Sequence, residues 1–219
     1  MDEFAAESQA RASAAQSAGY FKEQIVPLTV KQGRKEINFE SDEFIRSETT
    51  FDSLANLRPA FAKDGLVTAG NSSGINDGSA SVILADANKI NSHTATPMAR
   101  IFSYGFGGVP ARIMGMGPVP ASRMALERAG LSVDDLAVVE SNEAFAAQAC
   151  AVSKQLGLDA SVVNPNGGAI ALGHPVGATG AIIMTKLIYE LRRRSARYGM
   201  ATMCIGGGQG ISIIVEAHP

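Results

Sequence analysis

The pattern of hydrophobic and polar positions changes near residue 79. From there on, short apolar runs alternate with longer segments in which apolar residues recur every three or four positions. The short runs are typical of buried strands and the longer segments of amphipathic helices. We expect strands at 79–84, 99–104, 137–140, 201–205 and 210–215, and helices at 120–129, 143–156 and 178–197. Strands alternating with helices of this length predict an α/β fold in which helices pack on a layered sheet.

The last two expected strands are separated only by residues 206–209. A parallel crossover needs a dozen or more residues, so this connection is too short for one. We therefore expect the two strands to pair as an antiparallel hairpin.

The N-terminal part of the chain begins with an alanine-rich segment at 2–18. It opens with acidic residues and stops before Gly19, which predicts a helix. Two short strands are expected at 25–30 and 36–39 around a glycine turn, with Pro27 at a sheet edge.

Residues 41–78 have weak periodicity and several turn signals. We expect loops with one short helix near 51–57, in a region where a segment that grips a ligand would fit. The change of pattern predicts two domains, a loop-rich one at 1–78 and a regular α/β one at 79–219.

Composition narrows the class of protein. The 219 residues (22.8 kDa) are 46 % hydrophobic and 18 % charged, which argues against disorder. The formal charge is −2, whereas nucleic-acid-binding proteins usually show a basic excess. No secretory signal begins the chain, and no apolar run approaches the roughly 18 residues of a membrane span. We expect a cytoplasmic protein with two free thiols that binds neither nucleic acid nor membrane.

Three residues lie where α/β folds place their sites, near the ends of expected strands. Asn142 is either the N-cap of the following helix or a functional amide. His174 lies among five glycines ahead of a helix N-terminus that favours developing negative charge, and is either structural or an acid–base group. Cys204 ends a strand beside a glycine turn whose N–H groups suit an oxyanion hole, and is either a reactive thiol or an inert buried one.

Other candidate sites are weaker. Cys150 lies in an alanine-rich helix and is assigned to the core. The three histidines lie far apart and no CxxC pair occurs, so we expect no metal site. The glycine segment around His174 lacks the Gly-Lys-Ser/Thr ending of a phosphate loop. The arginines at 192–194 and Arg197 are interpreted as a solvated helix end rather than an anion site.

Five blocks of the sequence together resemble the signature motifs of one enzyme family. They are Asn-Ser-Ser-Gly-Ile-Asn-Asp-Gly at 71–78, Met-Gly-Met-Gly-Pro-Val-Pro-Ala at 114–121, Asn-Glu-Ala-Phe-Ala at 142–146, Gly-Gly-Ala-Ile-Ala-Leu-Gly-His-Pro at 167–175 and Cys-Ile-Gly-Gly-Gly at 204–208. In this order they resemble the thiolases, specifically the acetyl-CoA acetyltransferase type. The resemblance implies a thiolase-like βαβαββ layered half with a loop-rich excursion on its N-terminal side.

The resemblance also implies a reaction through a covalent acyl-cysteine, with no metal or redox cofactor. One acetyl-CoA acylates the nucleophile, and the enolate of a second attacks that thioester to give acetoacetyl-CoA and CoA. By similarity, Cys204 takes the proton next to the thioester. His174 activates the nucleophile and donates to the thioester oxygen, together with a water held by Asn142. The backbone N–H of Gly206 contributes to a second oxyanion hole.

Looser blocks imply the contacts with CoA. Ser73 resembles the residue that hydrogen-bonds the pantetheine arm, while Arg46 and Ser53 lie where the family contacts the nucleotide end. The residues expected to line the acyl-CoA channel are Phe61, Ala69, Met114 and Phe145.

One motif of the family is missing from the sequence. The nucleophilic cysteine of thiolases lies in a Cys-x-Ser-Gly setting, which neither Cys150 nor Cys204 has. We therefore expect the chain to be the second half of a thiolase, inactive alone and completed by the missing N-terminal half. The resemblance further implies a homodimer or tetramer that acts in fatty acid metabolism. The alternative is a CoA-binding or subunit-interaction module without the chemistry.

Overall fold

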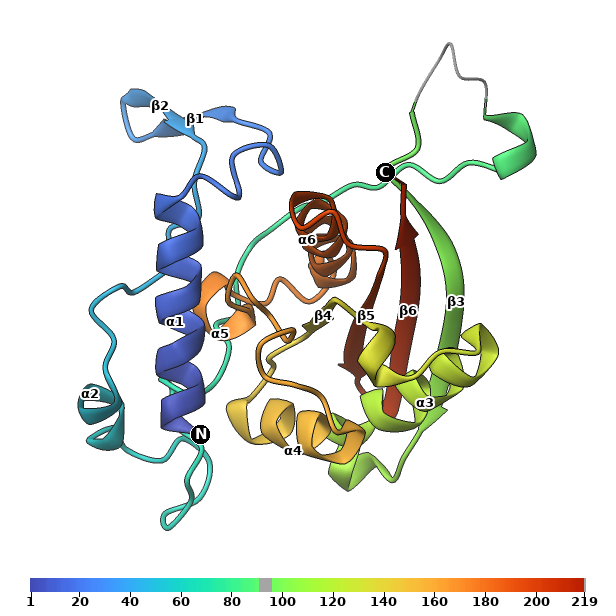
Figure 1. The fold of residues 1–219 in the computed structure, drawn as a ribbon. Helices are drawn as coiled ribbons and strands as arrows, with labels where there is room; N and C mark the ends of the chain where they lie inside the picture. The colour runs from blue at the N-terminus through green and yellow to red at the C-terminus, as the bar shows by residue number, and fades with distance from the viewer. Residues whose placement is uncertain (91–95, 219) are drawn as a thin grey trace.

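The computed structural model describes residues 1–90 and 96–218, and its centre is a four-stranded mixed sheet (Figure 1). The strand order is β3 (Ala99–Gly108), β6 (Gln209–Ala217), β5 (Tyr198–Ile205) and β4 (Val138–Ser141). β4 is parallel to β5, whereas β6 is antiparallel to both of its neighbours. The expected hairpin of the last two strands is confirmed, with Ile205 opposite Gln209 across the turn.

The sheet is covered by helices on both faces, because neighbouring residues of a strand point to opposite sides. On β4, Val139 packs with residues of α3 (Pro118–Ala129), while Val138 packs with residues of α6 (Thr179–Arg193). Neighbouring residues of β5 and β6 divide between the two faces in the same way. α4 (Ala146–Leu156) lies on the α3 side (Figure 1). The α/β prediction is therefore confirmed.

The N-terminal segment stands beside the sheet and its helices (Figure 1). α1 (Asp2–Ser17) packs on the short helix α5 (Ala169–Leu172), where Ala5 and Ile170 belong to one small apolar cluster. The buried side of α1 consists of small and polar residues, so its backbone approaches α5 closely. This contact fixes the segment that leads to His174.

The remaining elements of the N-terminal part agree closely with those predicted from the sequence. α1 and the short helix α2 (Phe51–Ala55) are confirmed, as is the hairpin of β1 (Leu28–Gln32) and β2 (Lys35–Phe39). Pro27 lies just before β1, so its missing N–H costs the hairpin no hydrogen bond.

Two helix boundaries differ from the prediction by three residues or more. α4 begins at Ala146 instead of residue 143, because Phe145 is extended and forms a bridge with Ser72. α6 ends at Arg193 instead of residue 197, because Ser195 adopts a left-handed conformation with φ of 51°.

The strand expected at 79–84 is wrong. These residues have no regular structure, and Ile83 and Leu84 are 97 % and 74 % exposed. An apolar run becomes a stable strand where a neighbouring strand satisfies its backbone hydrogen bonds. No strand within residues 1–90 and 96–218 pairs with this segment.

Candidate active site

The carboxyl ends of the parallel strands β4 and β5 bring two of the predicted residues to one edge of the sheet. Ser141, the last residue of β4, lies opposite Thr202 of β5, and the backbone N–H of Asn142 donates to the carbonyl of Thr202 at 2.9 Å. Cys204 lies a little further along β5, near its end. Asn142 and Cys204 therefore occupy the same edge.

His174 reaches this edge from a turn in front of α6. Gly173 has a φ of 92°, and a Cβ at this position would lie 2.4 Å from Oδ1 of Asn76, so the turn requires glycine. The backbone N–H of His174 donates to the carbonyl of Gly74 at 3.0 Å. These constraints place Nε2 of His174 3.3 Å from Nδ2 of Asn142.

Burial sets the protonation states of the site. It lowers the pKa of His174, so the imidazole is neutral at neutral pH. It raises the pKa of Cys204, which is 7 % exposed, so this residue is a thiol under the same conditions. The site therefore holds a neutral base and a weak acid at one edge of the sheet.

Asn142 does not cap a helix in this structure, and its amide group is free for another contact. Phe145 occupies the N-cap position of α4, and no side chain caps this helix. Asn142 is 2 % exposed, and its buried Oδ1 has no hydrogen-bond partner among the described residues. A buried amide oxygen left unpaired by the protein is suited to hold a bound group.

The turn between β5 and β6 exposes backbone beside Cys204. Gly208 has a φ of 95°, and a Cβ there would lie 2.2 Å from the carbonyl oxygen of Val109. Gly206, at the start of the same turn, is exposed with open space around it. The turn is thus fixed at Gly208 and leaves the backbone of Gly206 accessible.

Comparison with protein families agrees with this arrangement. Residues 95–217 match the thiolase C-terminal domain, and residues 1–88 match the thiolase N-terminal domain. The chain belongs to the thiolase family. The domain boundary expected between residues 78 and 79 stays a prediction.

Among curated thiolases, the chain is 56 % identical to beta-ketothiolase BktB of Cupriavidus necator, over 98 % of this chain and 55 % of that protein. It is 54 % identical to the acetyl-CoA acetyltransferase of Shinella zoogloeoides, over 99 % of this chain and 55 % of that protein. The chain thus spans about half the length of the curated relatives it matches.

Solved thiolase structures share the fold. The acetyl-CoA acetyltransferase of Bacillus anthracis superimposes with a TM-score of 0.96 at 49 % identity, covering 99 % of this chain and 55 % of the other. Human mitochondrial 3-ketoacyl-CoA thiolase in complex with CoA superimposes with a TM-score of 0.90 at 45 % identity, covering 99 % and 54 %.

Three of the residues expected to contact CoA lie beside the thiolase motif at 142–146. Residues Ser72 and Phe145 form an antiparallel bridge, and both the N–H and the hydroxyl of Ser73 donate to the carbonyl of Ala144 at 3.1 Å. Phe61 is 76 % exposed and meets Phe145 edge to face, with ring centroids 5.9 Å apart. Ser73, Phe61 and Phe145 therefore lie together at this motif.

The other four expected CoA contacts are scattered. Arg46 is exposed, and Ala69 lies in an exposed loop. The hydroxyl of Ser53 is used within α2, where it accepts from the N–H of Thr50 at 3.0 Å. Met114 lies partly buried in a short 3-10 helix. In the described part of the chain, no hydrogen bond connects these residues to His174 or Asn142.

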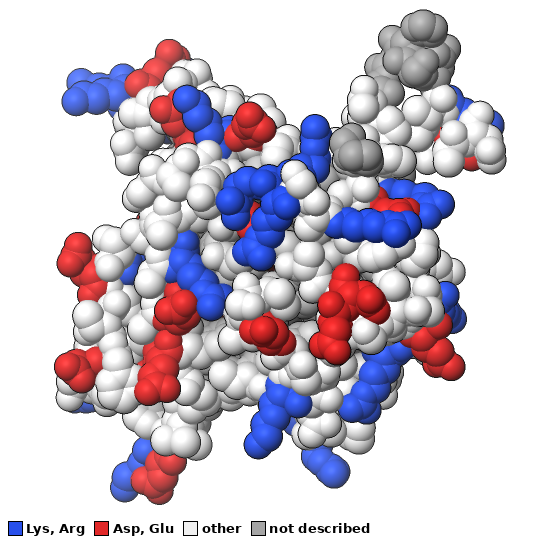
Figure 2. Space-filling view, in the orientation of Figure 1, with Lys and Arg blue, Asp and Glu red and all other residues white. Residues whose placement is uncertain are grey.

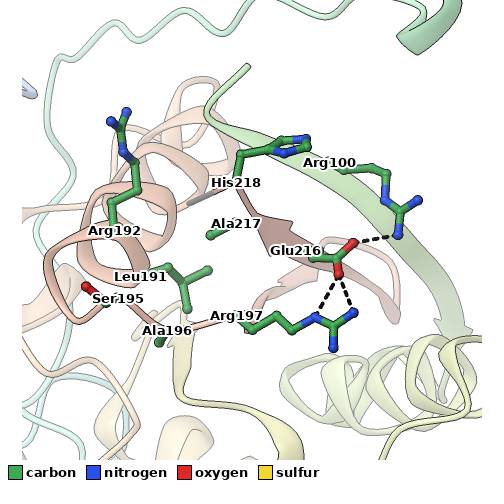
Figure 3. A pocket seen from close by; sticks show the side chains of 9 residues that line it. All are labelled: Arg100, Leu191, Arg192, Ser195, Ala196, Arg197, Glu216, Ala217 and His218. Carbon is green, nitrogen blue, oxygen red and sulfur yellow. Dashed lines mark hydrogen bonds and ion pairs between the residues drawn. The ribbon is translucent and has the colours of Figure 1, made fainter. Parts of the chain in front are cut away.

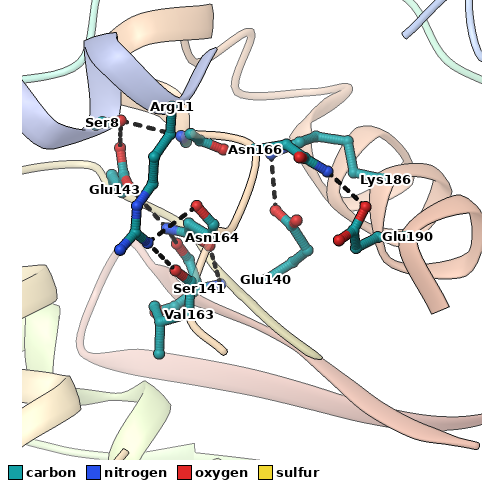
Figure 4. A network of polar contacts seen from close by, with 12 residues as sticks. Ser8, Arg11, Glu140, Ser141, Glu143, Val163, Asn164, Asn166, Lys186 and Glu190 are labelled. Atoms are coloured by element: carbon teal, nitrogen blue, oxygen red, sulfur yellow. Dashed lines mark hydrogen bonds and ion pairs between the residues drawn. The ribbon is translucent and has the colours of Figure 1, made fainter. Parts of the chain in front are cut away.

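A buried polar network behind the site was not foreseen from the sequence (Figure 4). Oε2 of Glu143 accepts from the Ser8 hydroxyl at 2.7 Å and from the N–H of Ile170 at 3.2 Å. Its Oε1 accepts from Nδ2 of Asn164 at 2.7 Å. Burial raises the pKa of Glu143, and these hydrogen bonds oppose that shift. Glu143 thereby ties α1 to the segment that leads to His174.

A second buried carboxylate of this network pairs with a lysine. Nζ of Lys186 lies 2.8 Å from Oε2 of Glu140 and donates to the carbonyl of Gly167 at 2.6 Å. A third buried carboxylate, Glu190, accepts from Nδ2 of Asn166 at 2.8 Å (Figure 4). The available sequence signal was the two glutamates, Glu140 at the end of the expected strand 137–140 and Glu143 three residues later.

The arginines around the end of α6 form a helix end, as expected, and several of them are ion-paired. Glu190 pairs with Arg193 and Arg194. Figure 2 shows Lys and Arg interspersed with Asp and Glu over the face drawn. A cavity of about 740 Å³ lies beside this helix end, and Glu216 in its wall pairs with Arg100 and Arg197 (Figure 3). α6 spans 15 residues, about 22 Å, so this cavity is remote from His174.

Three further sequence predictions concern the rest of the described chain. Cys150 lies in α4 and is only partly buried, so its assignment to the core holds only in part. No group of three or more His, Cys, Asp or Glu side chains in the described ranges is placed to hold a metal ion. Of the helices in those ranges, none has both the length and the apolar character needed to cross a membrane.

Proposed function

We propose that this chain carries the acid–base half of a thiolase active site. The reaction makes or cleaves the carbon–carbon bond between two acyl groups that are held as CoA thioesters. The observation that carries the proposal is the contact of His174 with Asn142 at the sheet edge where Cys204 lies. Membership of the thiolase family supports the reaction class.

In the first step, Nε2 of His174 takes the proton of a nucleophilic thiol. The thiolate attacks the carbonyl of one acetyl-CoA, and the carbon–sulfur bond to CoA breaks. The departing CoA thiolate takes a proton from Cys204, which becomes a thiolate. The raised pKa of Cys204 supports this role, because the residue begins the cycle as a thiol.

In the second step, the Cys204 thiolate removes a proton from the methyl group of a second acetyl-CoA. The resulting enolate attacks the acyl-thioester, and acetoacetyl-CoA leaves with the nucleophile as a thiolate, which recovers its proton from His174. Protonated Nε2 of His174 and a water on Asn142 stabilise the enolate oxygen, and the N–H of Gly206 stabilises the tetrahedral intermediate. CoA thioesters carry the acyl groups, so the scheme uses no metal or redox cofactor.

The nucleophile in this proposal comes from outside the present sequence. Cys150 is followed by Ala-Val-Ser and Cys204 by Ile-Gly-Gly, so neither has the Cys-x-Ser-Gly setting. A thiolase N-terminal half, as a separate chain or as part of a longer one, would supply it. The seven CoA contacts, a homodimer or tetramer, a role in fatty acid metabolism and a cytoplasmic location stay predictions.

Cleavage of acetoacetyl-CoA by CoA tests the proposal. The purified chain is assayed alone and mixed with a polypeptide that covers the part of C. necator BktB it does not match. We expect no turnover alone and turnover in the mixture. Cys204→Ser should lower the rate of the mixture by about 10²–10⁴-fold, the usual contribution of an acid–base group, whereas Cys150→Ser should leave it unchanged.

Turnover by the isolated chain at a normal rate would overturn the claim that the nucleophile is supplied from outside. A Cys204→Ser mixture as fast as the unaltered one would overturn the acid–base role. CoA binding by the isolated chain, with no turnover in any mixture, would favour the alternative of a CoA-binding or subunit-interaction module.

A further inference from the structure

The second ring nitrogen of His174 has a partner that the proposed mechanism does not use. Nδ1 lies 2.7 Å from the hydroxyl oxygen of Thr179, the first residue of α6. The nitrogen that carries the proton in a neutral imidazole is set by the hydrogen bond of the other nitrogen, and that partner is often a carboxylate or a carbonyl. In this chain a threonine hydroxyl takes that place.

The hydroxyl of Thr179 has a second neighbour that decides its direction. Oγ1 lies 2.9 Å from the carbonyl oxygen of Pro175, which can only accept. A threonine hydroxyl has one hydrogen and two acceptor lone pairs. When the hydrogen points to Pro175, Oγ1 is left as an acceptor for an N–H on Nδ1 of His174.

The other side of the ring fits the same assignment. Nδ2 of Asn142, an N–H donor, faces Nε2 at 3.3 Å. An unprotonated Nε2 can accept from this amide, whereas a protonated one would place two donors against each other.

We propose that Thr179 is a positioning residue that holds neutral His174 as the Nδ1–H tautomer, with Nε2 unprotonated and facing Asn142. Thr179 is 2 % exposed, and its backbone N–H also donates to the carbonyl of Pro175 at 2.9 Å. Its hydroxyl is therefore fixed within the turn that carries the ring.

This tautomer suits both halves of the proposed reaction. Unprotonated Nε2 can take the proton of a thiol. Once it has done so, the bond from Nδ1–H to Thr179 is unchanged, and Nε2–H is available as the donor that the proposed enolate step needs. The ring needs no rotation between its two roles. This consequence rests on the proposed function, whereas the tautomer itself does not.

The tautomer can be read by NMR on the isolated chain with ¹⁵N-labelled histidine. The chain has three histidines, and the signals of His174 are those missing in His174→Gln. Two-bond ¹H–¹⁵N correlations distinguish a protonated from an unprotonated ring nitrogen. Above the titration range of the ring, we expect a protonated Nδ1 and an unprotonated Nε2. A protonated Nε2 in the unaltered chain would overturn the proposal.

Two variants of Thr179 separate the hydroxyl from the side-chain volume. Thr179→Val keeps the shape and should move the ratio of Nδ1–H to Nε2–H forms about tenfold toward Nε2–H, the equivalent of one ordinary hydrogen bond. Thr179→Ser keeps the hydroxyl and should retain the original tautomer. A folded Thr179→Val chain with an unchanged tautomer, or a Thr179→Ser chain with an altered one, would contradict the assignment. If Thr179→Val does not fold, the unaltered chain and Thr179→Ser still decide.

Activity of the two-chain mixture provides an independent readout. Thr179→Val should lower kcat more than it raises KM, and Thr179→Ser should restore kcat. An inactive mixture with the expected tautomer would count against the proposed function and leave the role of Thr179 standing.

Discussion

Replacing Lys186 by methionine tests the buried network behind the site. The Lys186 side chain is 6 % exposed and lies 2.8 Å from Glu140, whose side chain is 1 % exposed. Methionine fills a similar volume without a charge or a donor. The substitution therefore leaves a buried carboxylate without its cation and removes the hydrogen bond to the carbonyl of Gly167.

The expected cost is large because the remaining carboxylate is buried. Removing one partner of a buried ion pair typically destabilises a protein by about 3–5 kcal/mol. The whole free energy of unfolding of a domain is about 5–15 kcal/mol. With a urea m-value of about 2 kcal/mol/M, the midpoint of unfolding should fall by about 2 M.

The loss should depend on pH with a definite sign. Burial already raises the pKa of Glu140, and the charge of Lys186 opposes that shift. Without Lys186 the pKa rises further, so the carboxyl binds a proton in the folded state more tightly than in the unfolded state. Stability then falls as pH rises from the unfolded value toward the raised folded value. The deficit of Lys186→Met should be larger at pH 8 than at pH 5.

Urea unfolding followed by circular dichroism at both pH values measures this effect. Lys154→Met on the exposed side of α4 is the matched control and should change stability by less than about 0.5 kcal/mol. The double variant Glu140→Gln, Lys186→Met should recover part of the loss at pH 8. Equal, small losses for Lys186→Met and Lys154→Met would refute the reasoning.

Two further predictions concern the glycine turn and the protonation states of the site. Gly208→Ala should lower Tm by about 5–10 °C, because the φ of 95° at Gly208 and the nearby Val109 carbonyl leave no room for a Cβ. Gly206→Ala is the control and should change Tm little, because the space around Gly206 is open. Equal shifts in Tm for the two variants would contradict this account. In the two-chain mixture, kcat/KM should stay level through neutral pH. It should fall only on the acid side of the ordinary histidine pKa of 6.5, since burial lowers the pKa of His174, and only on the alkaline side of the ordinary thiol pKa of 9.0, since burial raises the pKa of Cys204. A midpoint on the neutral side of either value would argue against that residue.

The strands and helices of the regular part were largely predictable because their patterns are local. The hairpin of β5 and β6 followed from the length of its connection, and α3 ends at Gly130, which adopts the left-handed conformation. The strand at 79–84 failed because a strand depends on a neighbour that an apolar run cannot specify by itself. The start of α4 failed because Phe145 is extended and bridges to Ser72, so Asn142, a good N-cap by residue type, lies three residues before the observed N-cap.

The residues of the candidate site were predictable from the sequence, but the residues that hydrogen-bond to them and hold them in place were not. Asn142, His174 and Cys204 stood out beside strand ends or glycine turns, and the family motifs selected them together. Thr179 lies outside the quoted motifs, and Glu143, although it lies in the motif at 142–146, was not singled out as a functional residue. A threonine at a helix start and a glutamate before a helix have ordinary roles at those positions.

The sequence by itself determined the periodic elements, the glycine turns and the set of reactive side chains, because these depend on residues close together along the chain. Only the tertiary structure decided which nitrogen of His174 meets Thr179 and which meets Asn142, and that Glu143 joins α1 to the segment before His174. Those contacts join residues far apart in sequence or depend on the geometry of one turn. Their formation depends on how α1, α6 and the sheet pack, and burial then makes each of these hydrogen bonds necessary.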